Sequence, residues 1–445
     1  MRFFRYYSKA AFLQYAEKYT QYTIRKSAAL QFGVVQSVEF VYLCATIPRN
    51  TLGMIDVEQM ALQRNRYPDM SDADFRFMLQ QVDGRQRTAR KLPVFANLDD
   101  WWYPVRLSCE QCSSEATARY KTMLASMHPL LQKLDVFCTD LTGGYGVDSY
   151  FFGQIFSRVD YIEQNEELCR IAAHNFGRYA PNIRIHNAEA ESYLADMTPC
   201  DLLFVDPARR DRNGGKVFRL EDCEPNVVTL LPLLQQKAKV LLFKLSPMLD
   251  ITAALRALSA IVWDTYVVAV ENEVKEVLLL SAADSAPRLT AVDLPAQWQA
   301  GKTYKSLSVS HDAEQRAIPA MASGIRCYIY EPNAAVLKAG LYNYVSEYYG
   351  IAKLSPNTHL YTSDELIVNF PGRVWKVCTP DEPLRQCNII TRNYPLTPDQ
   401  LKKKLTCHYG DIAFHLFTNI YFSLQSYAFF LTYTRYTPFL QSAIL

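Results

Sequence analysis

Three glycines after a short apolar stretch could form a turn that binds a nucleoside. Residues 136–140 are predicted to be a buried strand, and Gly143, Gly144 and Gly146 follow it ahead of a predicted helix. Glycines at such a turn let the backbone approach a nucleotide closely, which a side chain would obstruct. The third glycine of the dinucleotide fingerprint is absent, because Ser149 stands in its place. The turn therefore favours a cofactor without phosphates.

Acidic residues follow the next two predicted strands. Glu163 ends the strand at 159–163, and Glu189 follows the strand at 183–187. A carboxylate about 20 residues after the glycine turn accepts hydrogen bonds from ribose hydroxyls, and Glu189 with the amide of Ala190 could read adenine. Each acid alone would more often be a solvated strand end, but their order at successive strands favours a site. The candidate cofactor-binding residues are Asp140, Thr142, Gly144, Gly146, Asp148, Glu163, Gln164, Glu189 and Ala190.

A proline-containing turn follows the strand predicted at 201–205 and is the candidate for substrate chemistry. Ligands of open α/β sheets bind outside the carboxyl ends of the strands. Methyl transfer to an amine or ring nitrogen needs alignment of the acceptor and a hydrogen-bond acceptor to orient it, which Asp206 and the carbonyl of Pro207 could supply. The candidate catalytic residues are Asp206, Pro207, Ala208, Arg209 and Arg210.

The two arginines of this turn have two open interpretations. Guanidinium groups bind phosphates and base edges through paired donors, so Arg209 and Arg210 could hold a substrate. Salt bridges to Asp211 or Glu221 are equally compatible with the sequence.

The elements that must position these residues alternate between strands and helices. Such alternation predicts a mostly parallel sheet with helices on both faces. Two more strands, at 266–270 and 277–280, lie so close in sequence that they can only form an antiparallel hairpin. Five parallel strands followed by a hairpin are the order of class I methyltransferases rather than dehydrogenases. The five predicted strands are 136–140, 159–163, 183–187, 201–205 and 239–245.

The motifs resemble those of a bacterial family of class I methyltransferase-like proteins with a THUMP-like C-terminal domain. The resemblance spans about 57–410, and it departs from amine-methylating families because Arg209 stands where those place an aromatic residue. The helix beginning near Ser113 also resembles the segment before the catalytic domain of cap trimethylguanosine synthases. The motifs that carry the family resemblance are Asp140 to Asp148, Glu163, Asp206 to Arg210, Glu110 to Lys121, Tyr330 to Ala335 and Lys338 to Leu341.

This resemblance implies S-adenosyl-L-methionine as the cofactor, RNA, such as tRNA or rRNA, as the partner, and an α/β fold of several modules. The modules are a Rossmann-like class I methyltransferase sheet, an N-terminal helical module, and C-terminal ferredoxin-like and THUMP-like α+β modules. The expected boundaries are an extension of unknown role at 1–55, the helical module at 56–130, the methyltransferase domain at 131–284, the ferredoxin-like unit at 285–323 and the THUMP-like domain with an atypical tail at 324–445.

The composition is that of a folded enzyme of more than one domain. The chain has 445 residues, 49% apolar and 21% charged, with a net charge of +2, so any nucleic-acid surface must be local. The 11 cysteines lie in no secretory context and predict a reduced, cytoplasmic protein, with zinc at Cys109 and Cys112 a minor alternative. The uncharged segment 412–434 predicts a buried strand pair or helix rather than a membrane span.

Two basic clusters could contact RNA phosphates. One is Arg85, Arg87, Arg90 and Lys91, at the end of a helical pattern, and the other is Lys402, Lys403 and Lys404. A solvated helix face is the more common explanation for either. The hypotheses are therefore an RNA base methyltransferase, then a methyltransferase of DNA, protein or a small molecule, then a fold that binds cofactor or RNA without catalysis.

Overall fold

The computed structural model describes most of the chain and divides it into two compact units. The described residues are 56–209, 219–283, 286–377, 388–392, 397–405, 413–422 and 425–432. One unit contains residues up to Met127 together with Gln132–Asp201, and the other contains His128–Leu131 and the chain from Leu202 onward. The expected extension at 1–55 lies outside the described residues.

The first unit begins with helices, as the sequence predicts. Ser114 caps the last of them, because its Oγ accepts a hydrogen bond from the backbone N–H of Thr117 at 3.2 Å. The longest of these helices, α4 (Asp72–Thr88), buries Phe75, Met78 and Val82. The helices are α3 (Val57–Ala61), η3 (Arg64–Arg66), α4 (Asp72–Thr88), α5 (Pro93–Ala96), α6 (Arg106–Gln111) and α7 (Glu115–Met127).

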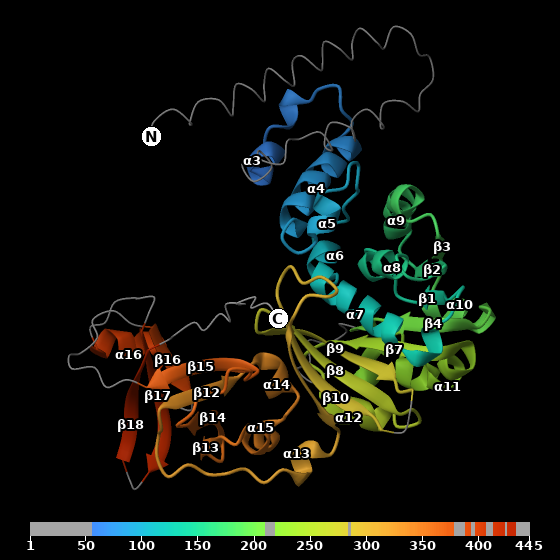
Figure 1. The fold of residues 1–445 in the computed structure, drawn as a ribbon. Helices are drawn as coiled ribbons and strands as arrows, with labels where there is room; N and C mark the ends of the chain where they lie inside the picture. The colour runs from blue at the N-terminus through green and yellow to red at the C-terminus, as the bar shows by residue number, and fades with distance from the viewer. Residues whose placement is uncertain are drawn as a thin grey trace, which may run out of the picture. The chain divides into compact units, whose positions relative to one another are not determined.

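The same unit then alternates strands and helices (Figure 1). Strand β1 pairs with β2, and β2 with β3, both in parallel. Because parallel strands end at one edge of a sheet, the residues after β1, β2 and β3 meet there. The elements are β1 (Phe137–Asp140), α8 (Val147–Phe152), β2 (Arg158–Glu163), α9 (Glu166–Tyr179), β3 (Ile183–Asn187) and α10 (Ala190–Asp196), with β4 (Cys200–Val205) at the boundary of the two units.

The second unit contains the predicted hairpin. Strands β8 and β9 pair antiparallel, and their turn places Glu271 and Asn272 at φ of 51° and 65°, the left-handed conformation that tight hairpins require. The elements here are η4 (Pro129–Leu131), β5 (Ala208–Arg209), η5 (Leu220–Asp222), β6 (Cys223–Glu224), α11 (Val227–Lys237), β7 (Ala238–Leu245), α12 (Ile251–Ala257), β8 (Trp263–Val270) and β9 (Glu273–Ser281).

The largest sheet has nine strands, in the order β11-β10-β8-β9-β7-β4-β1-β2-β3. This mixed sheet confirms the predicted α/β class. Its two additional strands are β10 (Arg288–Leu294), parallel to β8, and β11 (Lys305–Ser310), antiparallel to β10. The two strands of the segment at 285–323 therefore extend the large sheet, whereas the sequence predicts a separate ferredoxin-like unit there.

A seven-stranded sheet follows, in the order β13-β14-β12-β15-β18-β17-β16. The uncharged segment at 412–434 contributes two of its strands, which pair antiparallel; the strand pair predicted there is confirmed. The remaining elements are α13 (Ala313–Arg316), β12 (Tyr328–Pro332), α14 (Ala334–Lys338), α15 (Tyr342–Tyr349), β13 (Ala352–Ser355), β14 (Thr358–Ser363), β15 (Gly372–Val377), β16 (Asn388–Arg392), α16 (Pro398–Leu405), β17 (Ala413–Phe422) and β18 (Gln425–Thr432).

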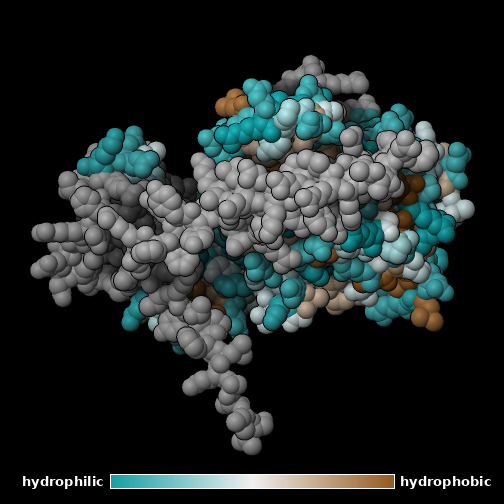
Figure 2. All heavy atoms as spheres, turned by 90° about the horizontal axis from the view of Figure 1, so that it is seen from above, coloured by the Kyte–Doolittle hydropathy of each residue, from teal (hydrophilic) through white to brown (hydrophobic). Residues whose placement is uncertain are grey.

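The visible described surface is mainly hydrophilic, with hydrophobic side chains in small groups (Figure 2). The most exposed large apolar residues, such as Leu62, Leu134 and Ile318, lie far apart in the chain. Within the described ranges, no helix combines the length and the apolar character needed to cross a bilayer.

Candidate functional site

The glycine turn between β1 and α8 has the backbone conformation that the sequence predicts. Gly144 and Gly146 have φ of 54° and 82°, the left-handed region that favours glycine. The amide of Gly143 donates to the carbonyl of Ile162 on β2 at 2.8 Å. The hydroxyl of Tyr161 donates to the carbonyl of Gly144 at 2.6 Å. The turn is therefore held against the end of β2.

The three glycines serve different purposes. A Cβ on Gly143 would lie 2.2 Å from the ring of Tyr161, and one on Gly146 would lie 2.5 Å from Phe176. These two positions must be small because of the protein's own packing. At Gly144 the nearest atom to a Cβ is 3.8 Å away, so only there does the missing side chain leave open space beside the backbone.

Glu163, the predicted ribose acceptor, ends β2 and binds the turn directly. Its Oε2 accepts the amide of Gly144 at 2.8 Å, and its Oε1 accepts the amide of Asn165 at 2.8 Å. The side chain is half-buried. Each carboxylate oxygen has a second lone pair, so Glu163 can still accept hydrogen bonds from a ligand.

A cavity of about 500 Å³, largely open to solvent, lies at the ends of β2 and β3. The side-chain amide of Asn187 donates to the carbonyls of Glu163 and Gln164 at 2.9 and 3.1 Å, which joins the ends of β2 and β3. The volume falls within the usual range of small-molecule sites, about 300–1,000 Å³. The residues that line the cavity are Gln164, Asn165, Asn187, Ala188 and Glu189.

Two predicted adenine-reading positions open helix α10 at this cavity. Glu189 is the N-cap residue of α10, and its side chain makes no capping hydrogen bond. It is exposed, and Ala190 is the first residue of the helix. Glu189 lines the cavity, and adenine recognition by Glu189 and Ala190 stays a prediction.

Asp140 and Thr142 lie inside the turn. Asp140 is 1% exposed; its Oδ1 accepts the amide of Thr142 at 3.1 Å and its Oδ2 accepts the hydroxyl of Ser149 at 2.5 Å. These contacts fix the path of the chain from β1 into α8. Asp140 therefore supports the turn, and a direct contact with a cofactor stays a prediction.

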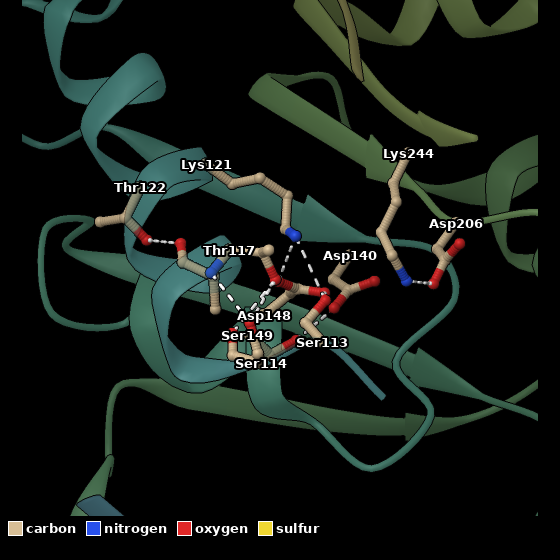
Figure 3. A network of polar contacts seen from close by, with 11 residues as sticks. Ser113, Ser114, Thr117, Lys121, Thr122, Asp140, Asp148, Ser149, Asp206 and Lys244 are labelled. Carbon is tan, nitrogen blue, oxygen red and sulfur yellow. Dashed lines mark hydrogen bonds and ion pairs between the residues drawn. The ribbon is translucent and has the colours of Figure 1, made fainter. Parts of the chain in front are cut away.

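Asp148 is the remaining candidate in this unit, and its carboxylate contacts Ser113, which precedes α7, and Lys121 of α7 (Figure 3). Its Oδ2 accepts the hydroxyl of Ser113 at 2.7 Å, and its Oδ1 lies 3.2 Å from the ammonium of Lys121.

Burial raises the pKa of the Tyr161 hydroxyl well above its usual range. This hydroxyl therefore stays protonated and donates to the carbonyl of Gly144 in the glycine turn.

The predicted substrate turn belongs to the second unit. The ammonium of Lys244 on β7 forms an ion pair with Oδ2 of Asp206, which Figure 3 shows at the side of the view. Pro207 is buried, whereas Ala208 is exposed and pairs with Glu224 of β6. An oriented, partly exposed carboxylate can accept a hydrogen bond from a substrate.

The arginines of this turn are only partly described. The backbone of Arg209 belongs to β5, opposite Cys223. Arg210 and Asp211 lie outside the described residues. Neither of the two interpretations of the arginines is therefore tested.

The sequence reasoning missed the lysines that hold the two candidate aspartates. Lys121 and Lys244 come from elements distant in sequence from Asp148 and Asp206. A lone lysine in a helix or strand carries no spacing signal. It also missed the role of Asn187, whose place at the end of β3 was the available clue.

The first basic cluster is engaged within the protein. Arg85 is 9% exposed and donates to the carbonyl of Ala96. Arg87 binds Asp83, and the ammonium of Lys91 donates to backbone carbonyls at the end of α6. These contacts leave little support for a phosphate site on this face.

The other candidates have simple environments. The thiol of Cys109 contacts the carbonyl of Pro104 and that of Cys112 contacts the carbonyl of Cys109. Among the described residues no group of three or more metal-binding side chains occurs. Of the second basic cluster, Lys403 is exposed on α16, and the side chains of Lys402 and Lys404 lie outside the described part.

Comparison with known proteins gives one match to a family model and several to solved structures. A ferredoxin-like domain model matches residues 328–371. This segment includes β12, α14, α15, β13 and β14, so the ferredoxin-like domain lies after the expected 285–323. A comparison with curated proteins gives no match.

A crystal structure of a candidate methyltransferase from Porphyromonas gingivalis W83 aligns with a TM-score of 0.74. The identity is 25%, and the alignment covers 91% of this chain and 100% of that chain. Human methyltransferase-like protein 13 in complex with SAH aligns at 18% identity over 39% of this chain and 84% of that chain, with a TM-score of 0.32. A TM-score this low carries no inference. The first alignment supports a methyltransferase-like fold for nearly the whole chain.

Proposed function

We propose that the protein is an S-adenosyl-L-methionine-dependent methyltransferase that acts on a base of structured RNA. The observation that carries the proposal is the polar cavity at the ends of β2 and β3, beside a glycine turn whose Gly144 amide is bound by Glu163. The similarity to a candidate methyltransferase over the full length of that protein supports the same reaction class.

The residues fit a nucleoside cofactor that has no phosphate. Glu163 offers lone pairs to ribose hydroxyls, and Gly144 lies next to open space. Gln164 and Glu189 line the cavity, where their polar groups suit an adenine edge. When bound, the cofactor supplies a methyl group activated by a sulfonium. The chain's own residues bind and orient that cofactor.

Asp206 is the proposed orienting group for the methyl acceptor. Its carboxylate follows β4, at the end of the strand where ligands of open α/β sheets bind. The ion pair with Lys244 fixes its direction. An acceptor amine can donate a hydrogen bond to Asp206, which aligns its lone pair for an in-line transfer.

RNA as the acceptor rests on the family resemblance and on two surface features. Tyr344 and Tyr348 of α15 stack with ring centroids 5.4 Å apart, and Tyr348 is 61% exposed. Exposed aromatic rings stack with unpaired bases. Lys403 adds an exposed cation on α16. DNA, protein or a small molecule, and cofactor binding without turnover, are the alternative outcomes of the test.

The first experiment measures cofactor binding and methyl transfer together. Wild-type protein should give a calorimetric signal with S-adenosylhomocysteine. It should also transfer labelled methyl groups from S-adenosyl-L-methionine to total RNA. Asp206→Ala should abolish transfer with little loss of cofactor affinity, whereas the exposed control Asp222→Ala should leave transfer unchanged. A folded wild type that gives no heat at millimolar cofactor contradicts the assignment. Labelled protein or DNA in place of RNA would select another acceptor.

The second experiment tests RNA capture by the C-terminal cluster. Changing Lys402, Lys403 and Lys404 to Gln should weaken RNA binding across sequences and reduce its salt dependence, because each lost phosphate contact lowers the slope by about one. Cofactor binding should not change. Equal RNA affinities and equal slopes for the variant and the wild type would locate RNA recognition elsewhere.

A further inference from the structure

A fully buried lysine contacts the helix that follows the glycine turn. Lys121, on α7, has a relative exposure of 0%. Its ammonium lies 3.2 Å from Oδ1 of Asp148 and 3.2 Å from Oγ of Ser113. Ser113 in turn donates to Oδ2 of Asp148 at 2.7 Å. The lysine, the serine and the aspartate therefore form a closed polar triad (Figure 3).

The stability of the core does not by itself require charged side chains at these positions. Moving an ammonium and a carboxylate out of water carries a desolvation cost that their attraction often only balances, and apolar side chains of similar volume can replace such pairs without loss of stability. The hydroxyl of Ser113, however, donates to Asp148 and accepts from the ammonium of Lys121, and such directed contacts to charged groups fix position more strictly than apolar contacts do. The contribution of the triad is the precise placement of Asp148 relative to α7.

Asp148 is where that placement reaches the proposed cofactor site. It lies in the first turn of α8, two residues after Gly146. The next residue, Ser149, donates to Asp140 at the end of β1. The first turn of α8 is thus attached to β1 through one residue and to α7 through the other. The loop that connects β1 to α8 contains Gly144, whose backbone N–H donates a hydrogen bond to the carboxylate of Glu163.

We propose that Lys121 is a positioning residue for the cofactor, which acts through Asp148 to hold the glycine turn in its binding conformation. The proposal rests on the proposed function for its ligand, but the ordering of the turn can be measured without one. Loss of the ammonium releases Asp148 from α7, so the turn explores other conformations and the fraction competent to bind falls.

The test compares Lys121→Met with a control, Lys133→Met, at a lysine whose side chain is 42% exposed. Lys133 also pairs with a buried aspartate of this unit, Asp201, at 2.7 Å; Asp201 holds the first residue of β1 rather than the turn. Ser113→Ala is a milder variant that keeps the ion pair and can be used if Lys121→Met does not fold. The readouts are hydrogen exchange of amides 142–149 without ligand, thermal unfolding, and affinity for S-adenosylhomocysteine well below the unfolding temperature.

Lys121→Met should speed exchange of the turn amides and weaken affinity by about ten-fold, and Ser113→Ala should do the same to a smaller degree. Lys133→Met should lower the unfolding temperature but leave the turn exchange and the affinity within two-fold of wild type. Wild-type exchange at 142–149 in the folded Lys121 variant, or in Ser113→Ala if that is used, would overturn the proposal. Absence of binding by wild type would contradict the proposed function, while exchange would still decide whether Lys121 orders the turn.

Discussion

Replacing Glu163 with Gln should weaken cofactor affinity as much as replacing it with Ala, although Glu and Gln have the same shape. Both carboxylate oxygens accept backbone amides, from Gly144 and from Asn165, each at 2.8 Å. A Gln side chain has one oxygen and one NH2 group. One of the two backbone N–H groups would therefore face the side-chain NH2 group, and the other would bond to a neutral oxygen instead of a charged one.

The magnitude follows from the two contacts. A hydrogen bond to a charged group contributes about 1.5–3 kcal/mol, and an unsatisfied donor costs about 1–3 kcal/mol. Because Glu163 is half-buried, water offsets part of this, and we expect a loss of about 1–3 kcal/mol. If the loss falls on the binding conformation, affinity for S-adenosylhomocysteine drops about five- to 150-fold.

The assay is calorimetric titration of wild type, Glu163→Gln and Glu163→Ala, with Glu167→Gln as the control. Glu167 is about half-exposed and pairs with Arg170 within α9, so its replacement should change stability by less than about 1 kcal/mol. Wild-type affinity in a folded Glu163→Gln variant would refute the reasoning, because it would mean that the turn does not depend on this carboxylate.

Two further predictions concern stability. Gly146→Ala should lower the free energy of unfolding by about 1–3 kcal/mol, because its Cβ would lie 2.5 Å from Phe176 and its φ is 82°. Gly177→Ala in α9 should raise it by about 0.5–1 kcal/mol, because an added Cβ there would have no neighbour within 4 Å outside the helix backbone. Urea unfolding measures both changes. Burial alone would raise the pKa of Asp160, but hydrogen bonds led by that from Arg158 lower it. The stability that Arg158 contributes through Asp160 is then complete above about pH 4 and is lost as the pH falls through the lowered pKa of Asp160. The difference in unfolding free energy between wild type and Arg158→Met should therefore shrink below about pH 4. A difference that stays constant with pH would contradict this linkage.

The sequence predicted the large sheet well because buried strands are continuous apolar runs. The strand predicted at 239–245 is Ala238–Leu245, and the one at 201–205 is Cys200–Val205. The position of β10 was not predictable in the same way. Its burial pattern is irregular, and it pairs in parallel with β8 rather than with β9, the strand that precedes it in the chain.

The candidate site was predictable to the extent that it follows from strand order. Gln164 and Glu189 lie in separate segments, yet they line one cavity because β2 and β3 are parallel neighbours. The supporting contacts were not predictable. The pairing of Lys121 with Asp148 and of Lys244 with Asp206 depends on how helices and strands pack, which leaves no periodic trace in the sequence.

The segment before β1 packs against the glycine turn, as the contacts of Tyr145 show. This residue of the glycine turn accepts a hydrogen bond from the indole N–H of Trp101 at 2.8 Å and donates to the carbonyl of Trp102. Asn175 of α9 binds the backbone of Trp102 at both its N–H and its carbonyl. Trp101 and Trp102 thus complete the core around the turn. Since α7 reaches the same turn through Lys121, the residues before β1 form part of the structure that shapes the proposed cofactor site.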